Sequence, residues 1–141
     1  MKVLVAIDGS ETALRALSYV VDHQEFFSAN PELLLVNVHL PVPSGRAKAV
    51  LGNDVIAQYY KEEAEEMLAP ARAVLAGKSC RVTERQIIGQ PANEIIAVAQ
   101  EDGCDMIVMG THGRSAIGNL VLGSVAMRVI ATSSVPVLSI K

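Results

Sequence analysis

The amino-acid sequence predicts an α/β fold, namely a single doubly wound sheet of five parallel strands with helices on both faces. Short apolar runs alternate with segments whose apolar residues recur at helical spacing, which is typical of this fold class. The first, second and fourth runs are apolar at consecutive positions, as strands covered on both faces must be. The chain has 141 residues, so we expect 1–141 to form one domain.

Five runs have the composition of strands, and we expect them, in chain order, over 3–7, 33–38, 81–88, 105–109 and 135–140. The third run carries Arg81, Glu84 and Arg85 and is therefore predicted at an edge of the sheet. The fifth contains Pro136, which cannot donate a hydrogen bond, so it is predicted at the other edge. Right-handed crossovers then favour the strand order 3-2-1-4-5.

Four helices are predicted between these strands. Ser10 or Gly9 is suited to cap the first helix, whose apolar positions extend to Val21. After a loop over 41–52, a long second helix runs to about Leu75, and its expected cap is Asn53 or Asp54. The third helix runs from Pro91 to Gly103, and the fourth covers 125–131 with Ser124 as its expected cap.

In this strand order the winding reverses between the first and fourth strands, and ligands of open α/β sheets bind at such a point. Those two strands end at Asp8 and Gly110. Gly110 begins the run Gly-Thr-His-Gly, and nine residues after Gly113 the pair Gly123-Ser124 opens the last helix. Glycine lets backbone approach a ligand closely, and a helix start suits phosphate. The sequence therefore predicts a nucleotide site.

Composition excludes several other classes of function. A net charge of −3 and the absence of Trp argue against nucleic-acid binding. Neither GxGxxG nor Gly-Lys-Ser/Thr occurs, so the dinucleotide fingerprint and the P-loop are absent. The two cysteines, Cys80 and Cys104, have no CxxC spacing and are expected to be free thiols. With no signal-peptide core and no membrane-length apolar run, we expect a cytoplasmic protein.

The chain resembles the universal stress proteins, and specifically their ATP-binding subclass. The family signature of Gly, two residues, Gly, nine residues and Gly-Ser is complete over 110–124. The opening Ala6-Ile7-Asp8-Gly9-Ser10, the turn 89–92 and the last strand 135–138 are also similar to the family pattern. The resemblance spans the whole chain and implies the adenine nucleotide alpha hydrolase-like fold.

The resemblance also implies a set of roles. Asp8 would contact the ribose or a Mg or Mn ion near the phosphates, Val38 would meet adenine through its backbone, and Gly110 would lie along the ribose. The implied nucleotide-binding set, for ATP, ADP or AMP, is Asp8, Gly9, Ser10, Val38, Met109, Gly110, His112, Gly113, Arg114, Gly123, Ser124 and Val125. The family commonly forms homodimers through the fifth strand, here Val135, Pro136, Val137, Leu138 and Ile140.

Three functions are compatible with this sequence. The leading hypothesis is an ATP-binding dimeric regulator of the stress response, read by an unknown downstream protein. A slow ATPase is the second, but no base or water-positioning residue accompanies Asp8, and Arg114 is only a possible charge-stabilising cation. We therefore expect weak hydrolysis at most and assign no catalytic residue. The third is a dimeric scaffold without ligand, in which the glycines form only a turn. His39 is expected to have a surface or packing role rather than to bind a ligand.

Overall fold

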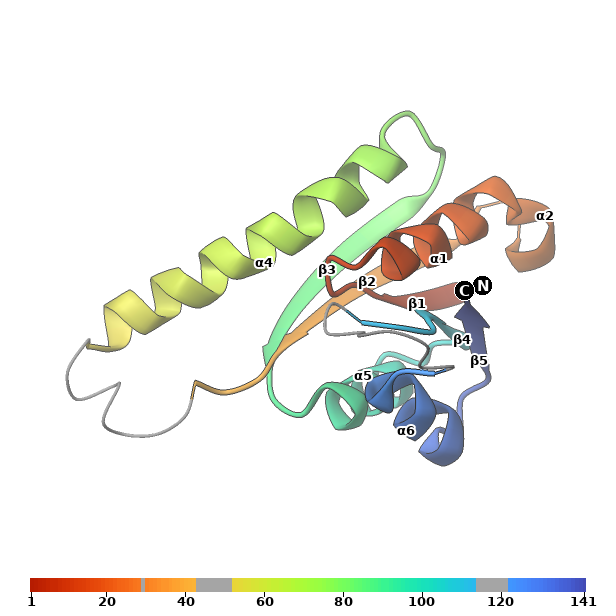
Figure 1. The fold of residues 1–141 in the computed structure, drawn as a ribbon. Helices are drawn as coiled ribbons and strands as arrows, with labels where there is room; N and C mark the ends of the chain where they lie inside the picture. The colour runs from red at the N-terminus through yellow and green to blue at the C-terminus, as the bar shows by residue number, and fades with distance from the viewer. Residues whose placement is uncertain (29, 43–51, 114–121) are drawn as a thin grey trace.

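The computed structural model describes residues 1–28, 30–42, 52–113 and 122–141 (Figure 1). Its strands are β1 (Lys2–Ala6), β2 (Glu32–His39), β3 (Arg81–Ile88), β4 (Met106–Gly110) and β5 (Val137–Ile140). Its helices are α1 (Glu11–Asp22), α2 (Gln24–Phe27), α4 (Asn53–Leu75), α5 (Pro91–Glu101) and α6 (Ser124–Thr132). Each predicted strand and helix is present, whereas the four-residue helix α2 was not predicted.

The strands form one parallel sheet in the order β3-β2-β1-β4-β5, which confirms the predicted fold class and both predicted edges. β1 lies in the middle, with Leu4 paired to Leu34 of β2 on one side and to Ile107 of β4 on the other. The last strand starts later than predicted, because Pro136 precedes it and contributes only a carbonyl, to which Ile107 N–H donates (2.9 Å).

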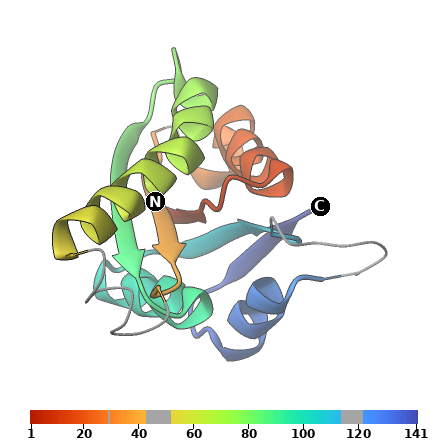
Figure 2. The same ribbon diagram turned by 60° about the vertical axis from the view of Figure 1, so that its left-hand side comes forward.

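Two apolar layers hold the helices against the sheet. Helices α1 and α4 cover one face and α5 and α6 the other (Figures 1 and 2). Side chains of β1 alternate between the layers, so that Val3 and Val5 pack with Leu17 under α1 while Leu4 packs with Ile95 of α5. Both faces of the central strands are thereby removed from water, which explains their consecutive apolar residues.

Two of the predicted helix caps are wrong. Ser10 caps α1 as expected, since its Oγ accepts from Ala13 N–H (3.2 Å). Gly52 rather than Asn53 or Asp54 caps α4, because the Gly52 carbonyl accepts the first helical hydrogen bond, from Ile56 N–H (3.4 Å). This cap has no side-chain hydrogen bond. Gly123 rather than Ser124 caps α6, because the Gly123 carbonyl accepts the first helical hydrogen bond, from Met127 N–H (2.9 Å).

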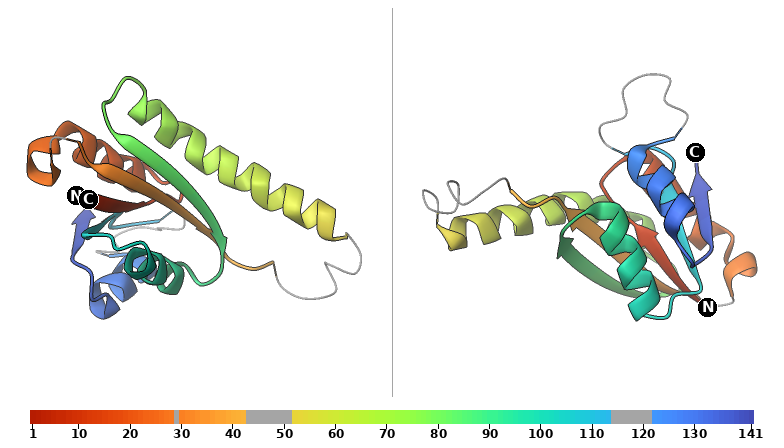
Figure 3. Two further views of the ribbon diagram at one scale, coloured as in Figure 1. Left: turned by 180° about the vertical axis from the view of Figure 1, so that it is seen from behind. Right: turned by 90° about the horizontal axis from the view of Figure 1, so that it is seen from below.

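Helix α4 is the longest element, with 23 residues, and its N-terminal half extends past the sheet (Figure 3). Its buried residues lie mainly in the second half, which is packed on the sheet: Ile56, Ala64, Met67, Leu68 and Ala71. The helix is continuous through Pro70. Among the described helices, none is both long and apolar enough to cross a membrane.

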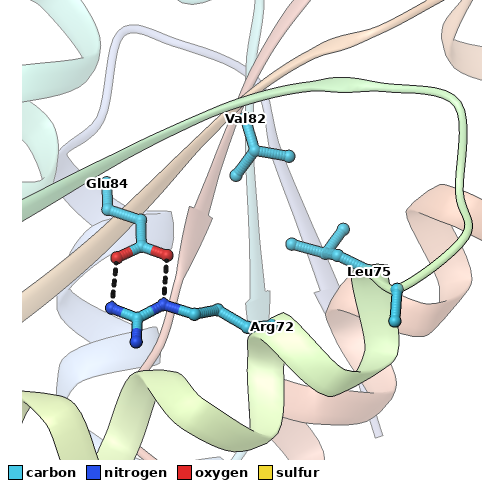
Figure 4. Close-up of a pocket in the computed structure, with 5 residues that line it drawn as sticks. Arg72, Leu75, Val82 and Glu84 are labelled. Carbon is cyan, nitrogen blue, oxygen red and sulfur yellow. Dashed lines mark hydrogen bonds and ion pairs between the residues drawn. The ribbon is translucent and has the colours of Figure 1, made fainter.

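A pocket of about 440 Å³ separates the C-terminal end of α4 from the edge strand β3 (Figure 4). Leu75 and Val82 form part of its wall, and Arg72 binds Glu84 through two hydrogen bonds of 2.8 Å each. The Arg72 guanidinium holds the pKa of Glu84 below its ordinary value. This pocket contains none of the residues predicted to bind a nucleotide.

Replacing Leu35 tests the packing of the α1–α4 layer. Leu35 is fully buried in β2 between β1 and β3. We expect Leu35→Ala to lower the free energy of unfolding by about 2–5 kcal/mol, because it removes buried surface and leaves a cavity. The matched control is Val82→Ala, whose side chain is 37% exposed, with an expected cost below about 1 kcal/mol. Urea unfolding followed by circular dichroism measures both; equal costs would contradict the described packing.

The Glu84 carboxylate makes stability depend on pH. Because the pKa of Glu84 is lowered in the folded protein, its contribution is present at neutral pH and is lost as the pH falls below the ordinary glutamate range of about 4.3. Relative to wild type, Glu84→Gln is expected to be less stable by at most about 1 kcal/mol at pH 7, since the pair is partly exposed, and this difference is expected to shrink as the pH falls toward about 3. Urea midpoints at the two pH values measure this difference. A difference that grows on acidification would refute the assignment.

Candidate nucleotide site

The site lies at the carboxyl ends of β1 and β4, which are neighbours in the sheet. Asp8 follows β1 by two residues, and Gly110 is the last residue of β4. We call Gly110–Gly113 the glycine loop. A Cβ on Gly113 would lie 2.9 Å from Asp8 Oδ2, so the loop passes directly beside the carboxylate. Two predicted site segments that are about a hundred positions apart in the sequence thus meet at one edge.

The turn between β1 and α1 is built around Asp8. Its Oδ1 accepts from Ser10 N–H (3.0 Å), so one carboxylate oxygen shapes the turn while Oδ2 faces Gly113. Gly9 has φ +76°, which a side chain would strain, and a Cβ there would lie 3.2 Å from Met67 Cγ. Helix α4 therefore packs against the outside of this turn.

Three elements hold the glycine loop by hydrogen bonds. Thr111 N–H donates to the carbonyl of Ile140 at the end of β5 (2.8 Å), and the Thr111 carbonyl accepts from Gly123 N–H at the start of α6 (2.7 Å). From α1, the hydroxyl of Thr12 donates to the carbonyl of His112 in a short hydrogen bond. The His112 ring nitrogen Nδ1 lies 2.9 Å from Thr111 Oγ1. The backbone of the loop is thereby fixed on both sides.

The glycines of this loop serve different purposes. A Cβ on Gly110 would lie 2.5 Å from Thr12 Oγ1 and 2.8 Å from the backbone nitrogen of Ala13. Gly110 is therefore required where α1 crosses the end of β4, a packing reason that the sequence argument about ligand approach did not include. Among the described residues, a Cβ on Gly113 would meet the end of the Asp8 side chain alone, so in this part of the chain Gly113 has the more open surroundings of the two.

The start of α6 stands beside the loop. A Cβ on Gly123 would lie 3.2 Å from the Thr111 carbonyl oxygen and 3.6 Å from the nitrogen of Gly113. Ser124 occupies the first turn of α6, whose N–H groups have no intrahelical acceptors. The loop and the helix start thus bring main-chain donors to one place, an arrangement that suits an anion.

The other predicted site residues are distributed around this centre. Val38 is the penultimate residue of β2 and packs against the α5–α6 layer, as does Val125 of α6. Met109 is buried in the same layer, so its side chain faces the core. Arg114 lies outside the described residues.

The described residues contain no group of three or more His, Cys, Asp or Glu able to hold a metal ion, so a cation beside Asp8 would take further ligands from phosphate and water.

Sequence reasoning missed how α4 secures the end of β2. His39 is buried, as expected for a packing role, and its Nδ1 lies 3.2 Å from Glu63 Oε2. The Tyr60 ring lies 5.9 Å from that imidazole, and its hydroxyl accepts from Val42 N–H (2.6 Å). The spacing of Tyr60 and Glu63 on one helix face was visible in the sequence, but their partners were not. These contacts hold the strand end that carries Val38.

Replacing Gly110 or Gly113 by alanine tests which of the two glycines is required for packing. Without ligand, Gly110→Ala is expected to lower the free energy of unfolding by about 1–3 kcal/mol, because its Cβ would press on the backbone of α1. Gly113→Ala, the matched control, should change it by less than about 1 kcal/mol, since its nearest neighbour among the described residues is a movable carboxylate. Denaturant unfolding of the ligand-free proteins gives both values. An equal or larger loss for Gly113→Ala would contradict the loop geometry.

Comparison with known proteins identifies the family. The family model "Universal stress protein family" matches residues 1–141. A universal stress protein of Thermus aquaticus, named for the QAH/OAS sulfhydrylase 3′ region, is 36% identical over 142 residues, covering 99% of this chain and 97% of its own length.

Two solved structures have the same fold. That of MJ0577 of Methanocaldococcus jannaschii superposes with a TM-score of 0.78 at 30% identity, covering 99% and 94% of the two chains. That of a universal stress protein from Archaeoglobus fulgidus in complex with dAMP superposes with a TM-score of 0.66 at 25% identity, covering 100% and 98%. The family signature, the strand order and these matches agree that the chain belongs to the universal stress protein family.

Proposed function

We propose that this protein is an ATP-binding universal stress protein, a dimeric regulator whose state depends on the bound adenine nucleotide. The observation that carries the proposal is the meeting of Asp8 with Gly113 beside the start of α6. At the switch point of the sheet, the Asp8 carboxylate is suited to bind a ribose or a cation. Main-chain donors of the glycine loop and of the start of α6 are suited to bind phosphate. The complex of a relative with dAMP supports an adenine nucleotide as ligand.

Each part of the site has a role in this proposal. Main-chain N–H groups of Gly113 and Ser124 bind the phosphates, whereas the Gly123 N–H is held by the Thr111 carbonyl and Gly123 lies alongside them. His112 and Arg114 are proposed to complete the surroundings of the phosphates. Asp8 binds the ribose or a Mg or Mn ion that the phosphates also hold, and the backbone of Val38 reads adenine. ADP and AMP fit the same contacts with fewer phosphates.

Binding rather than hydrolysis is the proposed activity. Phosphoryl transfer needs a metal, a positioned nucleophile and a cation for the developing charge. One oxygen of Asp8 already accepts from Ser10 N–H, so this carboxylate is committed to the turn and is poorly suited to act as a base. The nucleotide then acts as a ligand whose differential affinity for two states sets the response of the protein. A downstream protein reads the favoured state.

Substitution of Gly113 tests the phosphate contacts. Gly113→Val is expected to weaken Mg-ATP binding by at least about tenfold, because a branched side chain next to Asp8 Oδ2 would block close approach to the backbone. Isothermal titration with Mg-ATP measures the affinity. The control is Ala76→Val, which adds a branched side chain at an exposed position just after α4 and should leave the affinity unchanged. Wild-type affinity in Gly113→Val would refute the site.

Asp8→Asn tests the charge while keeping the oxygen that accepts from Ser10 N–H. If the carboxylate holds a metal ion, this variant should lose the gain in ATP affinity that Mg provides and should equal wild type without Mg. If the carboxylate binds ribose, ATP and adenosine should both weaken. An unchanged affinity for both ligands, with and without Mg, would remove Asp8 from the site.

The outer edge of β5, which pairs with no further strand among the described residues, is the proposed dimer interface. Ile107 and Thr111 of β4 and its loop donate to the carbonyls of Pro136 and Ile140. Because the amide and carbonyl of one residue share a side of the strand, the main-chain groups of Val137 and Ser139 point toward the free edge. An unpaired edge of this kind is a template for a second copy.

Ser139→Pro tests this interface, since it removes an outward donor without removing a hydrogen bond between β4 and β5. We expect wild type to sediment as a dimer at micromolar concentration and Ser139→Pro to shift toward monomer, with Ser139→Thr as the control that keeps the donor. A wild type that sediments only as a monomer would refute the interface.

A further inference from the structure

We propose that Thr12 is a positioning residue of the nucleotide site, whose hydroxyl fixes the orientation of the peptide between His112 and Gly113. The inference rests on the proposed function, since it concerns the phosphate end of the same site. Thr12 lies in the first turn of α1, a hundred positions before His112 in the chain. Neither the family signature nor the site residues predicted above include it.

Two hydroxyls converge on a single carbonyl oxygen. Thr12 Oγ1 donates to the oxygen of His112, and Ser10 Oγ lies 3.3 Å from the same oxygen as a second donor. Ser10 Oγ is itself fixed, because it also accepts from Ala13 N–H (3.2 Å). A carbonyl oxygen has two lone pairs, so both are occupied by α1. The orientation of this carbonyl is therefore determined by the start of the helix.

Fixing the carbonyl also fixes the next amide. The peptide bond is planar and trans, so the N–H of Gly113 points opposite to the carbonyl of His112, away from the first turn of α1. The Gly113 nitrogen lies 3.6 Å from where a Cβ on Gly123 would be, at the start of α6. The loop thus places an amide donor, turned away from α1, close to the helix start that is proposed to bind phosphate.

The opposite orientation of this peptide would disfavour the binding of an anion. If this peptide flipped, the oxygen of His112 would face the phosphates, and the Asp8 carboxylate already lies beside Gly113. A partial negative charge would then replace a donor next to a highly charged ligand. The hydroxyl of Thr12 opposes this flip because the flip would break its hydrogen bond.

The glycine at the end of β4 gives independent support. A Cβ on Gly110 would lie 2.5 Å from Thr12 Oγ1, closer than real Cβ atoms approach. A side chain at position 110 would therefore displace the Thr12 hydroxyl, and the residue there is glycine. The space that Gly110 leaves is occupied by the group that holds the loop.

Isosteric substitution tests the role of the hydroxyl. Thr12→Val keeps the shape and removes the donor, while Thr12→Ser keeps the donor and removes a methyl group. Affinities for Mg-ATP and for adenosine, which lacks phosphates, are measured by isothermal titration, and ligand-free stability by urea unfolding. We expect Thr12→Val to weaken Mg-ATP binding by roughly three- to tenfold, the equivalent of one hydrogen bond, with adenosine unchanged. Thr12→Ser should bind Mg-ATP as wild type does.

Each outcome separates this inference from the proposed function. If wild type binds neither ligand, the proposed function fails. If wild type binds Mg-ATP and Thr12→Val binds it equally well, the positioning role alone is refuted. Equal losses for Mg-ATP and adenosine, or equal losses in the valine and serine variants, would show general damage or a packing effect and would also refute it. Thr12→Ala, read in the same way, replaces Thr12→Val if the latter does not fold.

Discussion

The parallel pairing of β1 with β4 is the constraint on which the rest of the site depends. Val3 and Leu4 pair with Met106 and Ile107, so two strands that are distant in the sequence end at the same edge. Parallel neighbours need crossover connections. Because the winding reverses between β1 and β4, the connections through α1 and α4 lie on one face of the sheet and those through α5 and α6 on the other. The turn after β1 and the loop after β4 therefore meet with no helix between them, and Asp8 comes to lie beside Gly113.

Hydrogen bonds from three neighbouring elements hold the glycine loop at this edge. The loop after β4 is bonded to α1 through Thr12, to β5 through Ile140 and to α6 through Gly123. Each such bond contributes about 0.5–1.5 kcal/mol net, so their main effect is on geometry rather than on overall stability. A binding loop that is already ordered loses less conformational entropy when it binds a ligand. The link to β5 also connects the proposed site with the proposed dimer edge.

Much of the fold could be predicted from local patterns. The charges at Arg81, Glu84 and Arg85 marked β3 as an edge strand, and Pro136 marked the opposite edge, from which the strand order followed. The segments around Asp8 and Gly113 were expected to meet for the same reason, and they do. In these cases the type of each residue directly reflects whether its position is exposed at an edge or buried in the sheet.

The remaining features depend on contacts between distant residues. Ser124 is a residue type that commonly caps helices, but α6 begins one residue earlier, where Gly123 also donates to the Thr111 carbonyl, and no local pattern reveals that long-range bond. The contact of Thr12 with His112 is hidden for the same reason. Gly110 was interpreted through ligand approach, whereas its immediate neighbour is the backbone of α1. Helix α2 is a single short turn and gives no periodic signal.

Mass spectrometry of the small molecules released by heat from the freshly purified protein tests the central claim most directly. We expect an adenine nucleotide in near-stoichiometric amount, and the proportions of ATP, ADP and AMP would identify the resident form. A protein that releases no nucleotide and also fails to bind added Mg-ATP would contradict the account and favour a ligand-free scaffold, in which Gly110–Gly113 serves only as a turn.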